Sequence, residues 1–217
     1  AFEDLKWKDI DRWTKNTSLF IFGIVDGAFE LGLRTHSDLE FLVMYKKSPP
    51  ALKEFISRVE ALNISLFRHL SSKGVDGIIL ADDIAYQRGF LINPQVLREF
   101  FLPSMVRQAE EIERLGLIPF YHSDGYYYEI IPDLIEAGFR GVQCIEEGCG
   151  MNAADLQREF GEQLCLWGHL DVNDIEKAGR PGGLKELSDK LKELVSGSRI
   201  ILGTNCGLFE DMDISRL

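Results

Sequence analysis

The sequence predicts a parallel β/α barrel, and three observations lead to that prediction. Six short apolar runs alternate with helical stretches, most runs are apolar on successive residues, and polar side chains follow the runs directly. Continuous apolar runs are typical of parallel strands that are buried on both faces. Strand–helix alternation indicates βαβ units. In such a barrel, the catalytic side chains are expected at the C-terminal ends of the strands.

The predicted strands are short, rich in β-forming residues and bounded by turn residues. An open, doubly wound sheet is the alternative to a barrel, but neither GxGxxG nor GxxxxGKT follows any of the runs. The absence of these phosphate-binding sequences favours the barrel. The predicted strands are Ser18–Ile24, Val75–Leu80, Leu117–Tyr121, Gly141–Ile145, Leu164–Trp167 and Arg199–Leu202.

The stretches between the strands have the features of amphipathic helices. Apolar residues recur there at three- and four-residue spacing, Asn93-Pro94 is typical of a helix start, and Gly116, Gly138 and Gly161 are typical helix stops. The predicted helices are Asp38–Tyr45, Pro50–Ser72, Gln95–Leu115, Tyr128–Ala137, Asn152–Phe160 and Leu184–Val195.

Length and composition indicate one globular domain over residues 1–217. Hydrophobic residues make up 45% of the chain, and the net charge of -11 argues against a nucleic-acid partner, which requires a basic face. No apolar run approaches the roughly 18 residues of a membrane span. Four cysteines in a chain of this length do not suggest a disulfide scaffold, so a cytoplasmic setting is expected. Because the chain runs from Ala1 to Leu217, shortly after a strand, we expect an incomplete barrel.

Polar side chains follow five of the predicted strands, and a barrel would bring them to one mouth. A single pair could equally cap a helix, and this alternative is kept for Asp82 and Asp171. Three successive tyrosines from Tyr126 could line an aromatic mouth. The residues that follow the strands are Asp82, Asp83, His122, Ser123, Asp124, Glu146, Glu147, His169, Asp171, Asn205 and Cys206.

Three of these residues suggest a metal site. Imidazole, carboxylate and thiolate all bind zinc, and a catalytic zinc takes three protein ligands and keeps one open position. His122 and Asp124 are two apart, so in an extended segment they point the same way and could share an ion with Cys206. The alternatives are a hydrogen-bonded His122–Asp124 pair and a buried, small, apolar Cys206.

At these residues the sequence resembles the uroporphyrinogen decarboxylase superfamily, which includes corrinoid-dependent methyltransferases. The resemblance extends from about Ser18 to the C-terminus and consists of linked motifs in the same order. The motifs are Asp82-Asp83-Ile84-Ala85-Tyr86-Gln87-Arg88-Gly89, Asn93-Pro94 with Phe100-Phe101-Leu102-Pro103, His122-Ser123-Asp124-Gly125, Pro132-Asp133-Leu134-Ile135-Glu136-Ala137-Gly138, Gly168-His169-Leu170-Asp171 and Leu202-Gly203-Thr204-Asn205-Cys206-Gly207.

The resemblance implies a (β/α)8 barrel, of which about two N-terminal strands and the last helix would be missing here. It also bears on the reaction. Decarboxylases typically have Ser-His-Ala-Gly where this chain has His122-Ser123-Asp124-Gly125. They also have a histidine before the final glycine, where this chain has Cys206. The zinc methyltransferases instead have His-x-Cys and a later cysteine. His122 and Cys206 match their pattern, whereas Asp124 replaces the middle cysteine and would make the metal a harder Lewis acid.

Two enzyme classes therefore follow from the resemblance. The first is a methyltransferase that uses zinc to activate a small thiol, hydroxyl or methyl ether, with methylcobalamin or another corrinoid carried by a partner protein. Its metal ligands would be His122, Asp124 and Cys206. The alternatives are cofactor-free decarboxylation of a tetrapyrrole and a non-catalytic binding protein on the same fold. The oligomeric state is left open, and a homo-oligomer is one expectation. The residues expected to be catalytic are Glu147, Asp83 and His169, and those expected to bind substrate are Asp82, Gln87, Tyr126 and Asn205.

Overall fold

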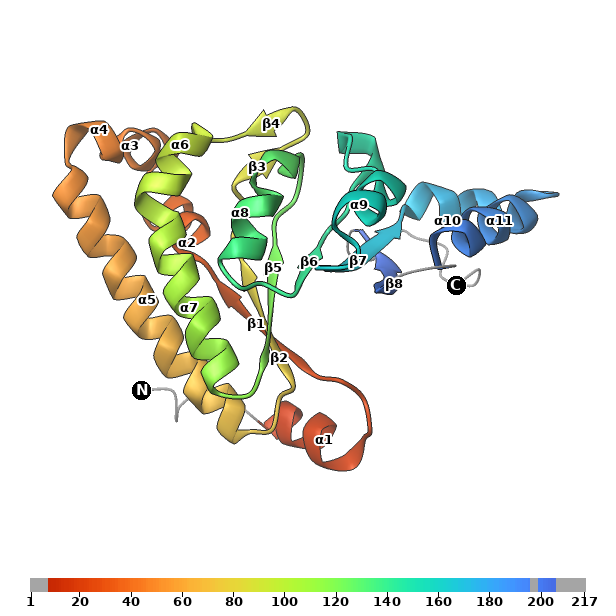
Figure 1. Ribbon diagram of the computed structural model, residues 1–217, viewed down its shortest axis with the longest axis horizontal. Coiled ribbons are helices and arrows are strands. Elements are labelled where there is room, and N and C mark those ends of the chain that lie inside the picture. Colours follow the sequence, from red (N-terminus) through yellow and green to blue (C-terminus); the bar gives the residue numbers. More distant parts are fainter. Residues whose placement is uncertain (1–7, 196–198, 206–217) are drawn as a thin grey trace.

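A computed structural model describes residues 8–195 and 199–205, and its centre is a parallel sheet. All five neighbouring strand pairs are parallel, and the strands lie side by side in chain order. A doubly wound sheet would reverse its strand order, so the predicted partial barrel is confirmed (Figure 1). The strands are β1 (Phe22–Asp26), β2 (Gly77–Ala81), β5 (Ile118–His122), β6 (Gly141–Gln143), β7 (Cys165–Leu170) and β8 (Ile200–Thr204).

Helices connect the strands and cover the outer face of the sheet. The two long helices, α5 (Pro49–Ser72) and α7 (Leu102–Arg114), pack against each other beside β1, β2 and β5 (Figure 1). Among the described residues, none of the helices combines the length and the apolar character that a membrane crossing requires. The other helices are α1 (Lys8–Asn16), α2 (Ala28–Thr35), α3 (Asp38–Leu42), α4 (Met44–Lys47), α6 (Pro94–Val96), α8 (Ile131–Glu136), α9 (Ala153–Phe160), α10 (Val172–Ala178) and α11 (Gly183–Val195).

Several elements differ from the sequence prediction. The predicted helix Asp38–Tyr45 is two short helices, α3 and α4, and α1, α2 and α10 were not predicted. The predicted helix Gln95–Leu115 contains a π-helical turn, η2 (Leu97–Phe101), between α6 and α7. Pro103 follows that turn and has no N–H to donate to the carbonyl of Glu99, so a regular helix cannot form there. Two short 3-10 turns, η3 (Tyr128–Ile130) and η4 (Glu147–Cys149), precede α8 and α9.

Aromatic rings pack on the inner face of the sheet, below the strand ends. The ring centroid of Phe22 in β1 lies 4.8 Å from that of Phe120 in β5 and 5.3 Å from that of Trp167 in β7. Glycines on neighbouring strands provide the room. A Cβ atom on Gly77 would lie 2.4 Å from the Phe22 ring, and one on Gly141 would lie 2.2 Å from the Phe120 ring. These glycines therefore allow large rings to fill the barrel interior.

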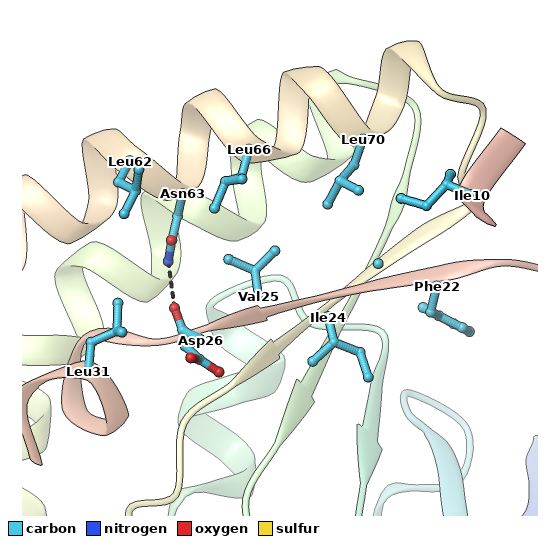
Figure 2. A pocket seen from close by; sticks show the side chains of 11 residues that line it. Ile10, Phe22, Ile24, Val25, Asp26, Leu31, Leu62, Asn63, Leu66 and Leu70 are labelled. Carbon is cyan, nitrogen blue, oxygen red and sulfur yellow. Dashed lines mark hydrogen bonds between the residues drawn. The ribbon is translucent and has the colours of Figure 1, made fainter. Parts of the chain in front are cut away.

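The sheet has two edges within the described part of the chain. There β1 pairs only with β2, and β8 only with β7, as expected for an incomplete barrel. Beside β1 lies a cavity of about 450 Å³. Figure 2 shows that apolar side chains of α5, Leu66 among them, line it across from β1, and that Asn63 Nδ2 donates to the carbonyl oxygen of Asp26 at 2.9 Å. Ile24 is 69% exposed at this edge.

A small hairpin covers the loops near the strand ends. β3 (Ala85–Tyr86) pairs antiparallel with β4 (Gly89–Phe90), and the carbonyl oxygen of Tyr86 accepts from the N–H of Tyr126 at 3.0 Å. Gly125 has a φ of +79°, and a Cβ atom there would lie 2.6 Å from the Tyr86 carbonyl. Only glycine fits both conditions, so Gly125 allows the loop after β5 to lie against the hairpin.

Candidate active site

A cavity of about 730 Å³ opens at the C-terminal ends of β5, β6, β7 and β8. This is the end of the sheet at which barrel enzymes carry their active sites. Four of the residues that the sequence places after the strands line it, namely His122, Asp124, Glu146 and Asn205. The rest of its lining comes from the inner faces and ends of the strands. The lining residues are His122, Asp124, Gln143, Glu146, Trp167, Ile201, Leu202, Gly203, Thr204 and Asn205.

His122 is the centre of a polar network at the end of β5. Its Nε2 atom lies 3.4 Å from Oδ1 of Asp83 and 3.8 Å from Oδ1 of Asp124. Its other ring nitrogen, Nδ1, is hydrogen-bonded to Oε1 of Gln143. Asp83 also accepts the backbone N–H of Asp124 at 2.9 Å. Both ring nitrogens are therefore engaged, and two carboxylates face Nε2.

The electrostatics of this network favour its charged forms. Burial by itself would raise the pKa of Asp83, but hydrogen bonds from His122 and from the backbone of Asp124 hold that pKa below its usual value. Burial by itself would lower the pKa of His122, but the hydrogen bond to Asp83 and the charges of Asp83 and Asp124 raise it. A positive charge is thus stabilised at Nε2, whether a proton or a metal ion supplies it.

The donor atoms of this network are close enough to share an ion. One ligand atom each from Asp83, His122 and Asp124 lies within 4.8 Å of the others. A second set of atoms within the same limit comes from Asp124, Cys144 and Glu146. The predicted ligands His122 and Asp124 therefore lie together. Cys206, the third, lies outside the described residues, so its role stays a prediction.

The loop after β5 is held in place by two carboxylates. Asp83 accepts the N–H of Asp124, and Glu146 accepts the next N–H, that of Gly125, at 2.8 Å. The Sγ atom of Cys149 also donates to Glu146 at 3.3 Å. Glu146 therefore faces the mouth, whereas Glu147, the residue expected to be catalytic, forms an ion pair with Lys190 at 2.6 Å.

Gln143 and Cys144 are site residues that sequence reasoning missed, whereas Glu146 was expected at the mouth but without a role. Gln143 is the register partner of His122 on the neighbouring strand, so their side chains share one face of the sheet. Cys144 is fully buried, has a φ of 72°, and donates from Sγ to the carbonyl oxygen of Asn205 at 3.1 Å. These positions depend on strand register, and nothing in the motifs identifies them.

One arginine and one lysine lie beside the carboxylates of the site, and each forms ion pairs with acidic side chains. Arg34 binds Asp26 and Glu30, each at 2.8 Å. Lys190 binds Asp174 at 3.0 Å in addition to Glu147. Their positive charges are balanced by these partners, so neither is available to neutralise a polycarboxylate without first breaking an ion pair.

The remaining predicted site residues lie at different depths. Asn205 lines the cavity, and its N–H donates to the carbonyl oxygen of Leu170 at 3.1 Å. Gln87 is exposed in the turn between β3 and β4. Tyr126 stacks on Tyr128, with ring centroids 6.3 Å apart, and does not belong to the cavity lining. His169 is buried, and burial and the charge of Lys190 lower its pKa.

Asp82 caps a helix from a distance of about fifty residues along the chain. Its Oδ1 atom accepts the N–H of Glu30, in the first turn of α2, at 2.7 Å, and the N–H of Phe29 also donates to it. Burial raises the pKa of Asp82 to about 8, against the opposing effect of these hydrogen bonds. The carboxyl group expected to bind substrate is therefore occupied by the backbone of α2.

We expect Asp82→Ala to lower the free energy of unfolding by about 2 kcal/mol, because it removes the cap of α2 and leaves buried N–H groups without an acceptor. Asp82→Asn keeps one acceptor oxygen and should cost about half as much. Urea unfolding of both variants measures the difference. Unchanged stability together with lost substrate binding would instead assign Asp82 to the substrate site.

The fold and this mouth define a class of protein, a partial β/α barrel whose polar groups gather at the C-terminal ends of the strands. Over residues 21–217 the sequence matches the family described as "Uroporphyrinogen decarboxylase (URO-D)". The chain belongs to that family. Among curated proteins there is no match.

The fold is also similar to that of a solved structure, described as a methyltransferase from Methanosarcina mazei. The two share 21% sequence identity with a TM-score of 0.73, over 92% of this chain and 57% of that protein. This chain thus spans little more than half the length of that methyltransferase. At this level of identity the likeness establishes the shared fold.

Proposed function

We propose that this chain belongs to a methyltransferase that activates a small thiol, hydroxyl or methyl ether with a bound metal ion, zinc in the first instance. The observation that carries the proposal is the grouping of Asp83, His122 and Asp124 at the mouth of the barrel. Membership of the family and the shared fold with a methyltransferase support the same reading.

The residues at the mouth fit a metal ion. His122 Nε2 faces two carboxylates at 3.4 and 3.8 Å, an arrangement that needs a positive charge between them. One nitrogen and two oxygens are ligands that zinc accepts, and the sequence motif offers Cys206 as a thiolate ligand. Three of these four donors would hold the ion and leave the open position that a catalytic zinc keeps. When bound, zinc acts as a Lewis acid that lowers the pKa of a thiol or hydroxyl, or polarises the oxygen of a methyl ether.

The residues of the chain would bind and orient the substrate beside this position. Asn205 and Trp167 line the cavity, so they would contact the substrate directly. Proton transfer is assigned to Glu146 rather than to Glu147, because Glu146 lines the cavity while Glu147 is paired with Lys190. Methylcobalamin or another corrinoid, carried by a partner protein, is the proposed methyl carrier and would approach this mouth.

Two of the other residues expected at the site take more distant roles in this proposal. Gln87, in the exposed turn of the β3–β4 hairpin, would contact a substrate or partner that covers the mouth. His169 is buried and is not among the residues that line the cavity, so it would act on the reaction only through its neighbours.

A decarboxylase acting on a tetrapyrrole is less well supported. Such a substrate carries several carboxylates, and several acidic side chains surround this mouth. Arg34, whose positive charge helps to lower the pKa of Asp83, already pairs with Asp26 and Glu30. Binding a polycarboxylate here would place like charges together, at a cost that none of the described lining residues offsets.

The proposal is tested by two assays on the purified protein, each with and without a chelator. One follows loss of uroporphyrinogen, and the other follows methyl transfer to or from cobalamin. We expect elemental analysis to find bound zinc, and we expect methyl transfer to be lost when the chelator is added. Decarboxylation that resists the chelator, with no methyl transfer, would overturn the proposal in favour of a carboxy-lyase.

The variant Cys206→Ser tests the proposed thiolate ligand. We expect zinc affinity to fall by about 10- to 100-fold and methyl transfer to fall with it, because a serine hydroxyl is a poor replacement for thiolate. Cys165→Ser is the matched control, since Cys165 opens β7 at the opposite end of the sheet. Unchanged zinc affinity in Cys206→Ser would exclude Cys206 as a ligand and leave the ion to Asp83, His122 and Asp124.

A further inference from the structure

We propose that Gln143 is a positioning residue that fixes the ring of His122 so that its Nε2 atom faces the metal position. The inference rests on the proposed metal-dependent function and adds a residue that the sequence motifs do not identify. Gln143 lies on β6, directly beside His122 on β5, because the two are register partners in the parallel sheet.

The hydrogen bond between the two side chains determines which ring nitrogen carries a proton. Oε1 of Gln143 can only accept, so Nδ1 of His122 must be the donor. The lone pair of the neutral ring is then on Nε2, which lies 3.4 Å from Asp83 and 3.8 Å from Asp124. A histidine that ligates a metal usually donates its other N–H to such an oxygen.

Without Gln143, the two carboxylates would favour the opposite arrangement. Asp83 and Asp124 both attract a proton to Nε2, and a proton there occupies the position that a metal ion would need. In the neutral ring, Gln143 opposes this arrangement because its acceptor oxygen holds the single proton on Nδ1, on the far side of the ring. Since an amide is neutral, it does so without adding a further negative charge to a mouth that already contains Asp83, Asp124 and Glu146.

Gln143 lies between two other side chains of the site. Its register partner on the other side is Trp167 of β7, so its side chain lies between His122 and the indole on the inner face of the sheet. All three side chains line the mouth cavity. The amide thus lies at the side of the site, where it contacts the ligand histidine rather than the metal position.

The first test is the Nδ1 proton of His122 in the metal-free protein, observed by NMR. The chain has four histidines, so the signal can be assigned by its absence in His122→Asn. We expect the proton to be visible and protected from exchange in the wild type, lost in Gln143→Leu, and retained in Gln143→Glu, which restores an acceptor. A purely structural role for Gln143 would not produce rescue by glutamate at this one signal.

The second test is zinc affinity, measured by competition with a chromogenic chelator. Gln143→Leu should bind zinc about 10- to 100-fold more weakly than the wild type, as is typical when the partner of a ligating histidine is removed. Gln143→Glu should bind at least as tightly as the wild type. Gln163→Leu, the same change at an exposed position after α9, should have no effect. Circular dichroism checks that each variant is folded.

The two tests separate this inference from the proposed function. If the wild type binds zinc and Gln143→Leu binds it equally well, Gln143 has no positioning role, although the metal site stands. If the wild type binds no zinc, the metal-dependent function is overturned. The positioning of His122 then stands if the Nδ1 proton is present in the wild type and lost in Gln143→Leu, and is overturned otherwise.

Discussion

His122→Ala is expected to lower zinc affinity by more than about 100-fold and to abolish methyl transfer. Loss of an outer partner of a ligand already costs about 10- to 100-fold, and loss of the ligand itself must cost more. His122 is the only nitrogen donor in the group formed with Asp83 and Asp124. Without it, the described part of the site keeps only two carboxylates, and such oxygen donors suit magnesium or calcium better than zinc.

The measurement for this variant is a zinc titration, followed by methyl transfer to cobalamin at saturating zinc. His36→Ala is the matched control, because His36 stacks on Phe41 at the end of α2, away from the mouth. That control should bind zinc like the wild type. If His122→Ala retained zinc and activity, the ion would have to bind through the second group, Asp124, Cys144 and Glu146, and the site proposed around His122 would be wrong.

The strands could be predicted because their signal is local. The central run Gly77–Ala81 is buried almost throughout, so its sequence is continuously apolar, and the same holds to a lesser degree for its neighbours. The order of the strands followed from the strand–helix alternation. The boundaries shifted by a few residues, as for β1, where the predicted run began at Ser18 and the strand begins at Phe22.

The helix α2 could not be predicted because what stabilises it lies elsewhere in the chain. Its N-terminal cap comes from Asp82, about fifty residues away, and not from a residue just before the helix. Its Gly32, a poor helix former, is required because a Cβ atom there would lie 2.0 Å from the ring of Phe41. Both features are tertiary, so no local pattern marks this segment as a helix.

The site could be predicted in part, for a related reason. His122, Asp124 and Asn205 were found because polar residues at strand ends converge in a barrel, and all three line the mouth. The sequence could not decide which of Glu146 and Glu147 lines the cavity, because adjacent residues at a strand end face different directions and only the loop geometry settles this. The position of Gln143 beside His122 likewise depends on the register of two strands.

Phe29→Ala is expected to produce the largest loss of stability, about 3–5 kcal/mol, because it removes a fully buried ring. The ring centroid of Phe29 in α2 lies 5.6 Å from that of Phe41 in α3 and 5.6 Å from that of Phe101 in η2. Three segments separated in sequence therefore meet at this one side chain, and a cavity there cannot close without moving one of them. Domains are typically stable by about 5–15 kcal/mol, so the loss is a large fraction of the total.

Thermal unfolding should show this loss as a fall in Tm of about 10 °C, since each kcal/mol corresponds to about 2–4 °C in a chain of this size. Phe20→Ala makes the same chemical change at a half-exposed ring beside Phe22, and should cost less than about 1 kcal/mol. Because α2 follows β1 and carries the N–H groups that Asp82 accepts, the Phe29 variant should also weaken the support of the mouth near Asp83. Equal losses in the two variants would mean that α2 does not pack on α3 and η2 as described.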